Sequence, residues 1–227
     1  LKETHDGIRQ QPGSYDATMA AIPLLRNAGI DVAIMTTVSK WNVQDIPLLV
    51  DEVVKNKADI FAFARYCPSK EDRDVCCSPE EYRDMMEQCW QKFQKYEAEG
   101  CETTFNLKDH LWTLFLYEKG IFDPNSYPDD EYVYDGCNCG NCHLTILSDG
   151  AVYACRRMES KVGNALNDDL YDLFTGVEFD KYGVYENFEK CSKCELLRFC
   201  RGCPAVAAGY HGNMYAPDPE CWKVIEE

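Results

Sequence analysis

The sequence predicts an α/β fold followed by a small cysteine-rich domain, and two patterns indicate this division. In the first part of the chain, segments with helical periodicity alternate with short apolar runs of strand length. Of the 14 cysteines, nine fall between Cys137 and Cys221. We therefore expect an α/β region at residues 1–100, a helix and linker at 101–136, and the cysteine-rich region at 137–227.

The first helix and strand are expected at the N-terminal end of the α/β region. Residues 14–28 have an apolar side, with Ser14 or Asp16 as the helix cap and Gly29 as the stop. Residues 30–38 are rich in β-branched side chains and show little alternation. This pattern is typical of a strand that is buried on both faces.

Two further helices and one strand follow. Apolar residues recur with helical spacing over 43–55, and a short apolar strand is expected at 60–64. Ser78 and Glu81 form a capping box, with Pro79 at the first position of a long helix. The alternation of helices and strands indicates parallel strands joined by crossover helices, as in a doubly wound sheet or a barrel that lacks its earlier strands.

The carboxyl ends of these strands are where such folds bind ligands. Thr37 and Val38 end the first strand, and Arg65 and Cys67 follow the second. Cys67 is a candidate for contact with a substrate or for hydrogen donation, although a buried small apolar role is at least as common for cysteine. Thr37 is expected mainly to stabilise the strand, because threonine favours strands, and contact with adenosine is the less favoured alternative.

One more helix is expected at 106–119, and residues 121–132, rich in Pro and Asp, form the expected linker. Beyond it, Asp149-Gly150 separates two short apolar runs, which is a strong hairpin signal. A two-residue turn would pair Leu144 with Cys155 and place Cys142 on the same face as Cys155. The two thiolates of Cys142 and Cys155 could then bind the same metal centre, with Cys137 or Cys139 as a third ligand.

A second group of cysteines has the spacing C-x2-C-x5-C-x2-C and is followed by Pro204. Zinc knuckles usually stand further apart, whereas the close packing and the proline resemble a ferredoxin run, in which one cysteine serves a second cluster. Nine thiols would make two sets of four with one spare. Iron–sulfur clusters are the leading interpretation, ahead of structural zinc and of disulfides. The residues of this group are Cys191, Cys194, Cys200 and Cys203, with Cys221 further on.

The charge and hydropathy of the chain exclude several classes of partner. Its 227 residues include 39 acidic and 23 basic side chains, for a formal net charge of −16, which disfavours binding to nucleic acid or to an anionic membrane. No run approaches the roughly 18 apolar residues of a membrane span, and no signal peptide is evident. We expect a cytoplasmic protein. Because the chain begins at Leu1 and not at a methionine, we also expect it to be part of a longer protein.

These cysteine motifs resemble the SPASM domain of radical S-adenosylmethionine (SAM) enzymes. The resemblance rests on G-x4-C at the end of the expected hairpin, on the C-x2-C-x5-C-x2-C run and on the final cysteine after Asp218-Pro219. The segments ETHDGIR, GSYD, TTVSKWN and FARYCP likewise resemble the last third or so of the family's partial (β/α)6 barrel. The resemblance covers essentially the whole chain.

The resemblance implies two auxiliary [4Fe-4S] clusters in this chain, and SAM with a third cluster in the complete enzyme. It further implies that Arg9 meets the SAM carboxylate, with Thr37 and Arg65 as additional SAM contacts. Auxiliary cluster I would be held by Cys137 or Cys139 together with Cys142, Cys155 and Cys203, and auxiliary cluster II by Cys191, Cys194, Cys200 and Cys221.

The sequence departs from the family pattern in three ways. The SAM-cleaving motif C-x3-C-x2-C is absent from these residues, so this chain alone is not expected to cleave SAM. The last linker of the run has two residues, Arg201 and Gly202, where the family usually has three. Arg156 stands where sulfatase-maturing members carry an acidic residue, which counts against that activity.

Members of the family often modify ribosomally made peptides, and the resemblance implies an oxidoreductase that joins a cysteine sulfur to a carbon in a thioether or related cross-link. The implied partners are a precursor peptide and a flavodoxin- or ferredoxin-type electron donor. The alternatives are an anaerobic sulfatase-maturase-like enzyme and a non-enzymatic electron-transfer or metal-stabilised interaction module.

Overall fold

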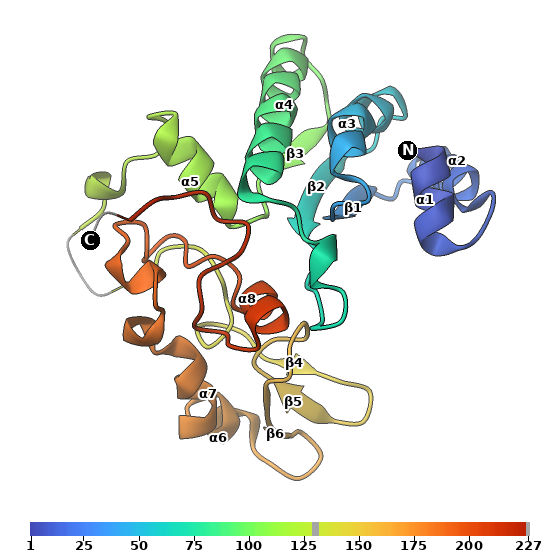
Figure 1. The fold of residues 1–227 in the computed structure, drawn as a ribbon. Coiled ribbons are helices and arrows are strands. Elements are labelled where there is room, and N and C mark those ends of the chain that lie inside the picture. The colour runs from blue at the N-terminus through green and yellow to red at the C-terminus, as the bar shows by residue number, and fades with distance from the viewer. Residues whose placement is uncertain (129–131, 226–227) are drawn as a thin grey trace. The chain divides into compact units, whose positions relative to one another are not determined.

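Three parallel strands organise the first part of the chain (Figure 1). The computed structural model describes residues 1–128 and 132–225. The chain divides into two compact units, one of Leu1–Tyr66 with Asp74–Trp112 and the other of Cys67–Arg73 with Thr113–Glu227. The elements of the first unit are α1 (Lys2–Arg9), α2 (Ser14–Asn27), β1 (Ala33–Val38), α3 (Ile46–Lys55), β2 (Ile60–Arg65), α4 (Pro79–Ala98), β3 (Thr104–Asn106) and the start of α5 (Leu111–Glu118).

The parallel arrangement predicted from the sequence is confirmed. Strand β1 pairs with β2, and β2 pairs with β3, with α3 and α4 as the crossover connections. The two crossover helices pack against each other (Figure 1). The Ser78–Glu81 capping box opens α4 as expected, with Ser78 accepting from the Glu81 N–H at 3.1 Å. The short polar strand β3 was not predicted, and α5 begins at Leu111 and not at residue 106.

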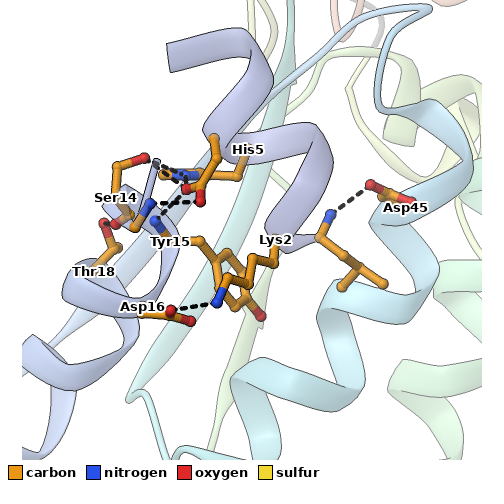
Figure 2. A network of polar contacts seen from close by, with 10 residues as sticks. Lys2, His5, Ser14, Tyr15, Asp16, Thr18 and Asp45 are labelled. Carbon is orange, nitrogen blue, oxygen red and sulfur yellow. Dashed lines mark hydrogen bonds and ion pairs between the residues drawn. The ribbon is translucent and has the colours of Figure 1, made fainter. Parts of the chain in front are cut away.

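Two local expectations in this unit are wrong. Strand β1 is not buried on both faces, because it lies at the edge of the sheet and its alternate residues are exposed; Met35 is 48% exposed. The predicted cap of α2 also differs, since Gly13 is the cap residue and neither Ser14 nor Asp16 caps the helix. The Asp6 carboxylate instead accepts the N–H groups of Gly13 and Tyr15 and the Ser14 hydroxyl. Figure 2 shows Ser14 and Tyr15 beside His5 in this network.

The core of the first unit is aromatic. Phe61 and Phe63 of β2 are fully buried, and Phe63 lies 5.6 Å from Trp112 between ring centroids. Phe93 of α4 stacks on Phe105 of β3 at 4.3 Å. Rings of this size bury large apolar areas and fix the helices against the strands.

Arg65, at the carboxyl end of β2, is part of this core. Its side chain is 1% exposed, and its Nε donates to Asp109 Oδ2 at 3.0 Å. Asp109 also accepts the N–H groups of Arg65 and Leu111, which places it at the start of α5. The pair therefore fixes the end of β2 to the start of α5.

The second unit is built from short elements. Its sheet has the order β4-β5-β6, all antiparallel, and its helices are short (Figure 1). Phe199 contacts three other rings, those of Phe122, Tyr127 and Tyr134, and the Tyr134 ring stacks on it with 5.5 Å between centroids. The expected linker continues to residue 132, but residues 129–131 lie outside the described part of the chain. The elements are β4 (Thr145–Ile146), β5 (Ala151–Tyr153), β6 (Lys161–Asn164), α6 (Leu170–Phe174), α7 (Val177–Asp180) and α8 (Pro204–His211).

The predicted hairpin is present, but its register is shifted by one residue. Thr145 pairs with Tyr153, and the Leu147 N–H donates to Ala151 O at 2.8 Å, so the turn has three residues and not two. Gly150 takes the left-handed position of this turn, with φ of 81°. The predicted pairing of Leu144 with Cys155, and the shared face that followed from it, are therefore wrong, because a slip of one residue exchanges the two faces of a strand.

No helix within residues 1–128 and 132–225 combines the length and the apolar character needed to cross a membrane.

Replacing Asp109 by Asn should destabilise the first unit strongly. The substitution removes the negative charge that Asp109 places beside the buried Arg65 guanidinium, and removing one partner of a buried ion pair typically costs about 3–5 kcal/mol of unfolding free energy. Urea unfolding followed by tryptophan fluorescence measures this loss. Asp31→Asn, at an exposed position, is the matched control and should change stability little. Equal effects of the two substitutions would contradict this account of the pair.

The same pair predicts a pH dependence. Burial, the largest single effect, would raise the pKa of Asp109, but the charges of Arg65 and His110 and the hydrogen bonds from Leu111 and Arg65 together outweigh it and hold the pKa below its usual value. Because the pKa is lower in the folded state than in the unfolded chain, the stabilisation is complete above about pH 4 and is lost as the pH falls below it. Acid unfolding of the wild type and of Asp109→Asn should therefore converge at low pH. A constant difference in stability down to pH 2 would contradict this prediction.

Candidate functional site

Four buried thiols come together in the second unit from three separate segments. Cys137 and Cys139 lie in the loop before β4, Cys155 follows β5, and Cys203 precedes α8. The Cys139 thiol is hydrogen-bonded to Cys155, and Cys137 is close enough to Cys203 and Cys155 for their charges to affect its pKa. We call these four residues thiol group I.

The thiols of group I differ in their affinity for protons. The hydrogen bond from Cys139 lowers the pKa of Cys155 to about 6. The same bond, with burial, raises the pKa of Cys139, and burial together with the charge of Cys203 raises the pKa of Cys137. Four thiolates packed so closely need a positive centre, and a metal ion deprotonates a ligating thiol outright.

A buried arginine fixes the loop that carries the first two thiols. The Arg201 guanidinium donates to the carbonyl oxygens of Cys137, at 3.0 Å, and of Cys139, and to Tyr182 O at 2.9 Å. Gly140 follows with φ of 67°, and a side chain there would overlap the backbone of Tyr182. The loop is therefore held by protein contacts that do not involve the sulfur atoms.

Three cysteines of the run, together with Cys221, surround one small cavity. Burial, followed by the charge of Cys221, raises the pKa of Cys191 to about 12, and burial raises that of Cys194. Leu114 and Leu196 are among the apolar residues that line the same cavity. We call Cys191, Cys194, Cys200 and Cys221 thiol group II.

Asp218 connects the two groups. Its buried carboxylate accepts the Cys203 N–H at 2.7 Å and the Glu220 N–H at 3.0 Å, and its carbonyl accepts the Cys221 N–H at 3.1 Å. Gly202 lies against this side chain with φ of 62°. Asp218, in the Asp-Pro pair before the last cysteine, thus accepts hydrogen bonds from the backbones of Cys203 in group I and Cys221 in group II.

The ninth cysteine of this region, Cys142, is exposed. The structure thus makes Cys142 the cysteine outside group I, whereas the sequence left one of Cys137 and Cys139 as the spare. The assignment of Cys142 as a ligand stays a prediction.

Each thiol group also has a nitrogen donor directed at sulfur. Arg157 Nη2 lies 3.2 Å from Cys203 Sγ, and the Arg157 N–H lies 3.5 Å from Cys155 Sγ. Lys190 Nζ lies 3.5 Å from Cys221 Sγ and 3.0 Å from Cys221 O. Such donors suit sulfur atoms that carry negative charge, as the ligands of an iron–sulfur cluster do.

The donor set fits two four-iron clusters, each of which takes four cysteine thiolates. A single zinc ion would bring its four sulfurs within about 3.8 Å of each other, given a Zn–S distance of about 2.3 Å. Within the described residues, no group of three or more His, Cys, Asp or Glu side chains is arranged to hold one metal ion.

The predicted SAM contacts lie in the first unit. Arg9 ends α1 and is exposed, and Thr37 is exposed near the carboxyl end of β1. Arg65 pairs with Val38 across the sheet, so its side chain is on the opposite face from Thr37 and is engaged by Asp109. The use of Arg65 as a SAM contact stays a prediction. Cys67, half-buried, belongs to the second unit.

Sequence reasoning missed the polar residues that support the thiols, namely Arg157, Lys190, Arg201 and Asp218. A local signal existed for most of them, because Arg156-Arg157 follows Cys155, Lys190 precedes Cys191 and Arg201 follows Cys200. Nothing in the spacing shows which atoms they contact, since their partners lie 15 to 64 residues away.

Comparison with known proteins agrees with this site. The model of SPASM, an iron–sulfur cluster-binding domain, matches residues 137–204. Fe-coproporphyrin III synthase of Methanosarcina barkeri is 25% identical over 248 residues, covering 100% of this chain and 61% of the relative. An AdoMet-dependent heme synthase of Nitratidesulfovibrio vulgaris is 27% identical over 227 residues, covering 96% of this chain and 61% of the relative. The chain thus spans about three fifths of these curated relatives.

The fold also matches solved structures of Streptococcus suis SuiB. One has a TM-score of 0.65 at 22% identity and covers 92% of this chain and 50% of SuiB. Another, of SuiB bound to the precursor peptide SuiA, has a TM-score of 0.65 at 23% identity over 92% of this chain and 48% of SuiB. Residues 137–204 therefore match the iron–sulfur cluster-binding SPASM domain, and the chain has the fold of the C-terminal part of SuiB.

Proposed function

We propose that the second unit holds two auxiliary [4Fe-4S] clusters and that the chain serves as the cluster-bearing part of a SAM-dependent oxidoreductase. The observation that carries this proposal is the sorting of eight thiols into two groups of four. The proposed ligands are the cysteines of thiol groups I and II, with Cys142 as an alternative to Cys137 or Cys139. When bound, such clusters accept and donate single electrons.

The protein's own part in this proposal is to prepare the ligands. Burial excludes water from group I, the Cys139–Cys155 hydrogen bond holds one thiol ready to deprotonate, and Arg201 sets the backbone from which two ligands project. Asp218 accepts the N–H groups of both Cys203 and Cys221 and so holds these two residues near each other in space. These contacts support two sites of fixed geometry.

The substrate we propose is a ribosomally made precursor peptide, in which a cysteine sulfur is joined to a carbon. The structure of SuiB with its precursor peptide supports this choice, because SuiB, about half of which shares the fold of this chain, binds a peptide. A flavodoxin- or ferredoxin-type protein would supply electrons. Arg156, in place of an acidic residue after Cys155, counts against a sulfatase maturase.

A second candidate substrate is an iron porphyrin. It is favoured by the curated relatives, whose names are Fe-coproporphyrin III synthase and AdoMet-dependent heme synthase and which cover 96% to 100% of this chain. The two candidates share the cluster-bearing domain and differ only in what the complete enzyme binds.

Anaerobically prepared protein should contain about eight iron and eight sulfide ions per chain, as two four-iron clusters require. Iron and acid-labile sulfide analysis measures this content. Cys139→Ala should lose about half of it, whereas Cys142→Ala should keep it if Cys142 is the spare thiol. Stoichiometric zinc without labile sulfide would overturn the cluster proposal.

The grouping of the thiols can be tested separately. Cys203→Ala should perturb the same paramagnetic resonance signal as Cys155→Ala, and Cys221→Ala the same signal as Cys191→Ala, because each pair lies close enough for the charge of one thiol to affect the pKa of the other. Spectra of the reduced variants report the result. If Cys203→Ala and Cys155→Ala alter different signals, the proposed ligand sets are wrong.

The substrate can be tested with the protein extended by its upstream coding sequence. The extended protein should cleave SAM to 5′-deoxyadenosine, and residues 1–227 alone should not, since they lack C-x3-C-x2-C. A cysteine-containing precursor peptide from the same locus should become lighter by two hydrogens. Turnover of Fe-coproporphyrin III with no change in the peptide would replace the first candidate by the second. Failure of the extended protein to cleave SAM would favour an electron-transfer module.

A further inference from the structure

Each thiol group is contacted by one cationic side chain, and the two cations come from different segments. The Arg157 guanidinium reaches Cys203 Sγ of group I at 3.2 Å, and the backbone N–H of the same residue points to Cys155 Sγ at 3.5 Å. The Lys190 ammonium reaches Cys221 Sγ of group II at 3.5 Å.

A positive donor on a ligating sulfur acts differently on the two redox states of a cluster. The reduced state carries one more negative charge than the oxidised state, so a cation or an N–H group beside the sulfur stabilises it more. Stabilising the reduced state raises the reduction potential. The effect is local, because an exposed charge is screened over about 8–10 Å at ordinary ionic strength.

We propose that Arg157 and Lys190 are positioning residues for electron transfer, with Arg157 raising the potential of the cluster in group I and Lys190 raising that of the cluster in group II. This inference rests on the proposed function, because it requires clusters in both groups. It goes beyond that function by assigning to each cluster its own residue for adjusting the potential.

The chain offers a matched control for each cation. Arg156 is adjacent to Arg157 and Lys193 lies three residues from Lys190, and both are exposed. Neither side chain has a hydrogen bond or ion pair to a cysteine among the described residues. Replacing either by Gln removes the same charge without removing a contact to sulfur.

The test is a redox titration of the anaerobic protein followed by paramagnetic resonance. Arg157→Gln should shift the midpoint of the signal that Cys155→Ala alters to a more negative potential and leave the other signal in place. Lys190→Gln should do the reverse. Arg157→Lys, which keeps a cation, should shift the midpoint less than Arg157→Gln, and Arg156→Gln and Lys193→Gln should shift neither signal.

Three outcomes would overturn the inference. These are unchanged midpoints in Arg157→Gln and Lys190→Gln, one signal shifted by both substitutions, and equal shifts in the control variants. A purely structural role would instead lower the iron content and leave the midpoint of the remaining clusters unchanged, which also counts against the inference. Wild-type protein without labile sulfide would refute the proposed function itself, before any midpoint is measured.

Discussion

The cysteine-rich unit depends on one buried cation, the guanidinium of Arg201. It donates to three carbonyl oxygens and lies over the rings of Tyr185, at 4.7 Å, and Phe188, at 5.3 Å. Because an unsatisfied buried charge is costly, the loop with Cys137 and Cys139 and the turn at Tyr182 must both keep their positions around it. The residue that fixes the loop is the neighbour of Cys200 in group II, so one side chain couples the backbones of the two thiol groups.

Between Cys200 and Cys203 the chain passes from one thiol group to the other within three residues. Such a short connection leaves few backbone conformations, and Gly202 supplies one that other residues rarely adopt, with φ of 62°. Asp218 then draws the C-terminal segment to the same place by accepting the Cys203 N–H. The two-residue linker between Cys200 and Cys203 is thus stabilised by a glycine and a carboxylate.

Much of the α/β unit could be predicted because its signals are local. Capping by Ser78 and the apolar periodicity of α3 depend on residues within one or two turns, and both predictions are confirmed. Strand β3 was missed because its three residues carry no local strand pattern and form a strand by pairing with β2, which is distant in sequence. The predicted pairing around Gly150 was wrong by one residue because Asp-Gly suits both two-residue and three-residue turns. At the site, the spacing predicted two sets of ligand cysteines, which stay a prediction, but not the Arg201 and Asp218 contacts, whose partners are distant in sequence.

The interleaving of the two thiol groups also affects biosynthesis. Group I is complete only when Cys203 has been added, and group II only when Cys221 has, although their first members lie at Cys137 and Cys191. During synthesis each group stays incomplete until its last cysteine has been added, so a cluster held by the four thiolates of one group could form only after that point. The hydrogen bonds from Arg201 to the carbonyl oxygens of Cys137 and Tyr182 need no metal, so they can hold the loop with Cys137 and Cys139 in place during that interval.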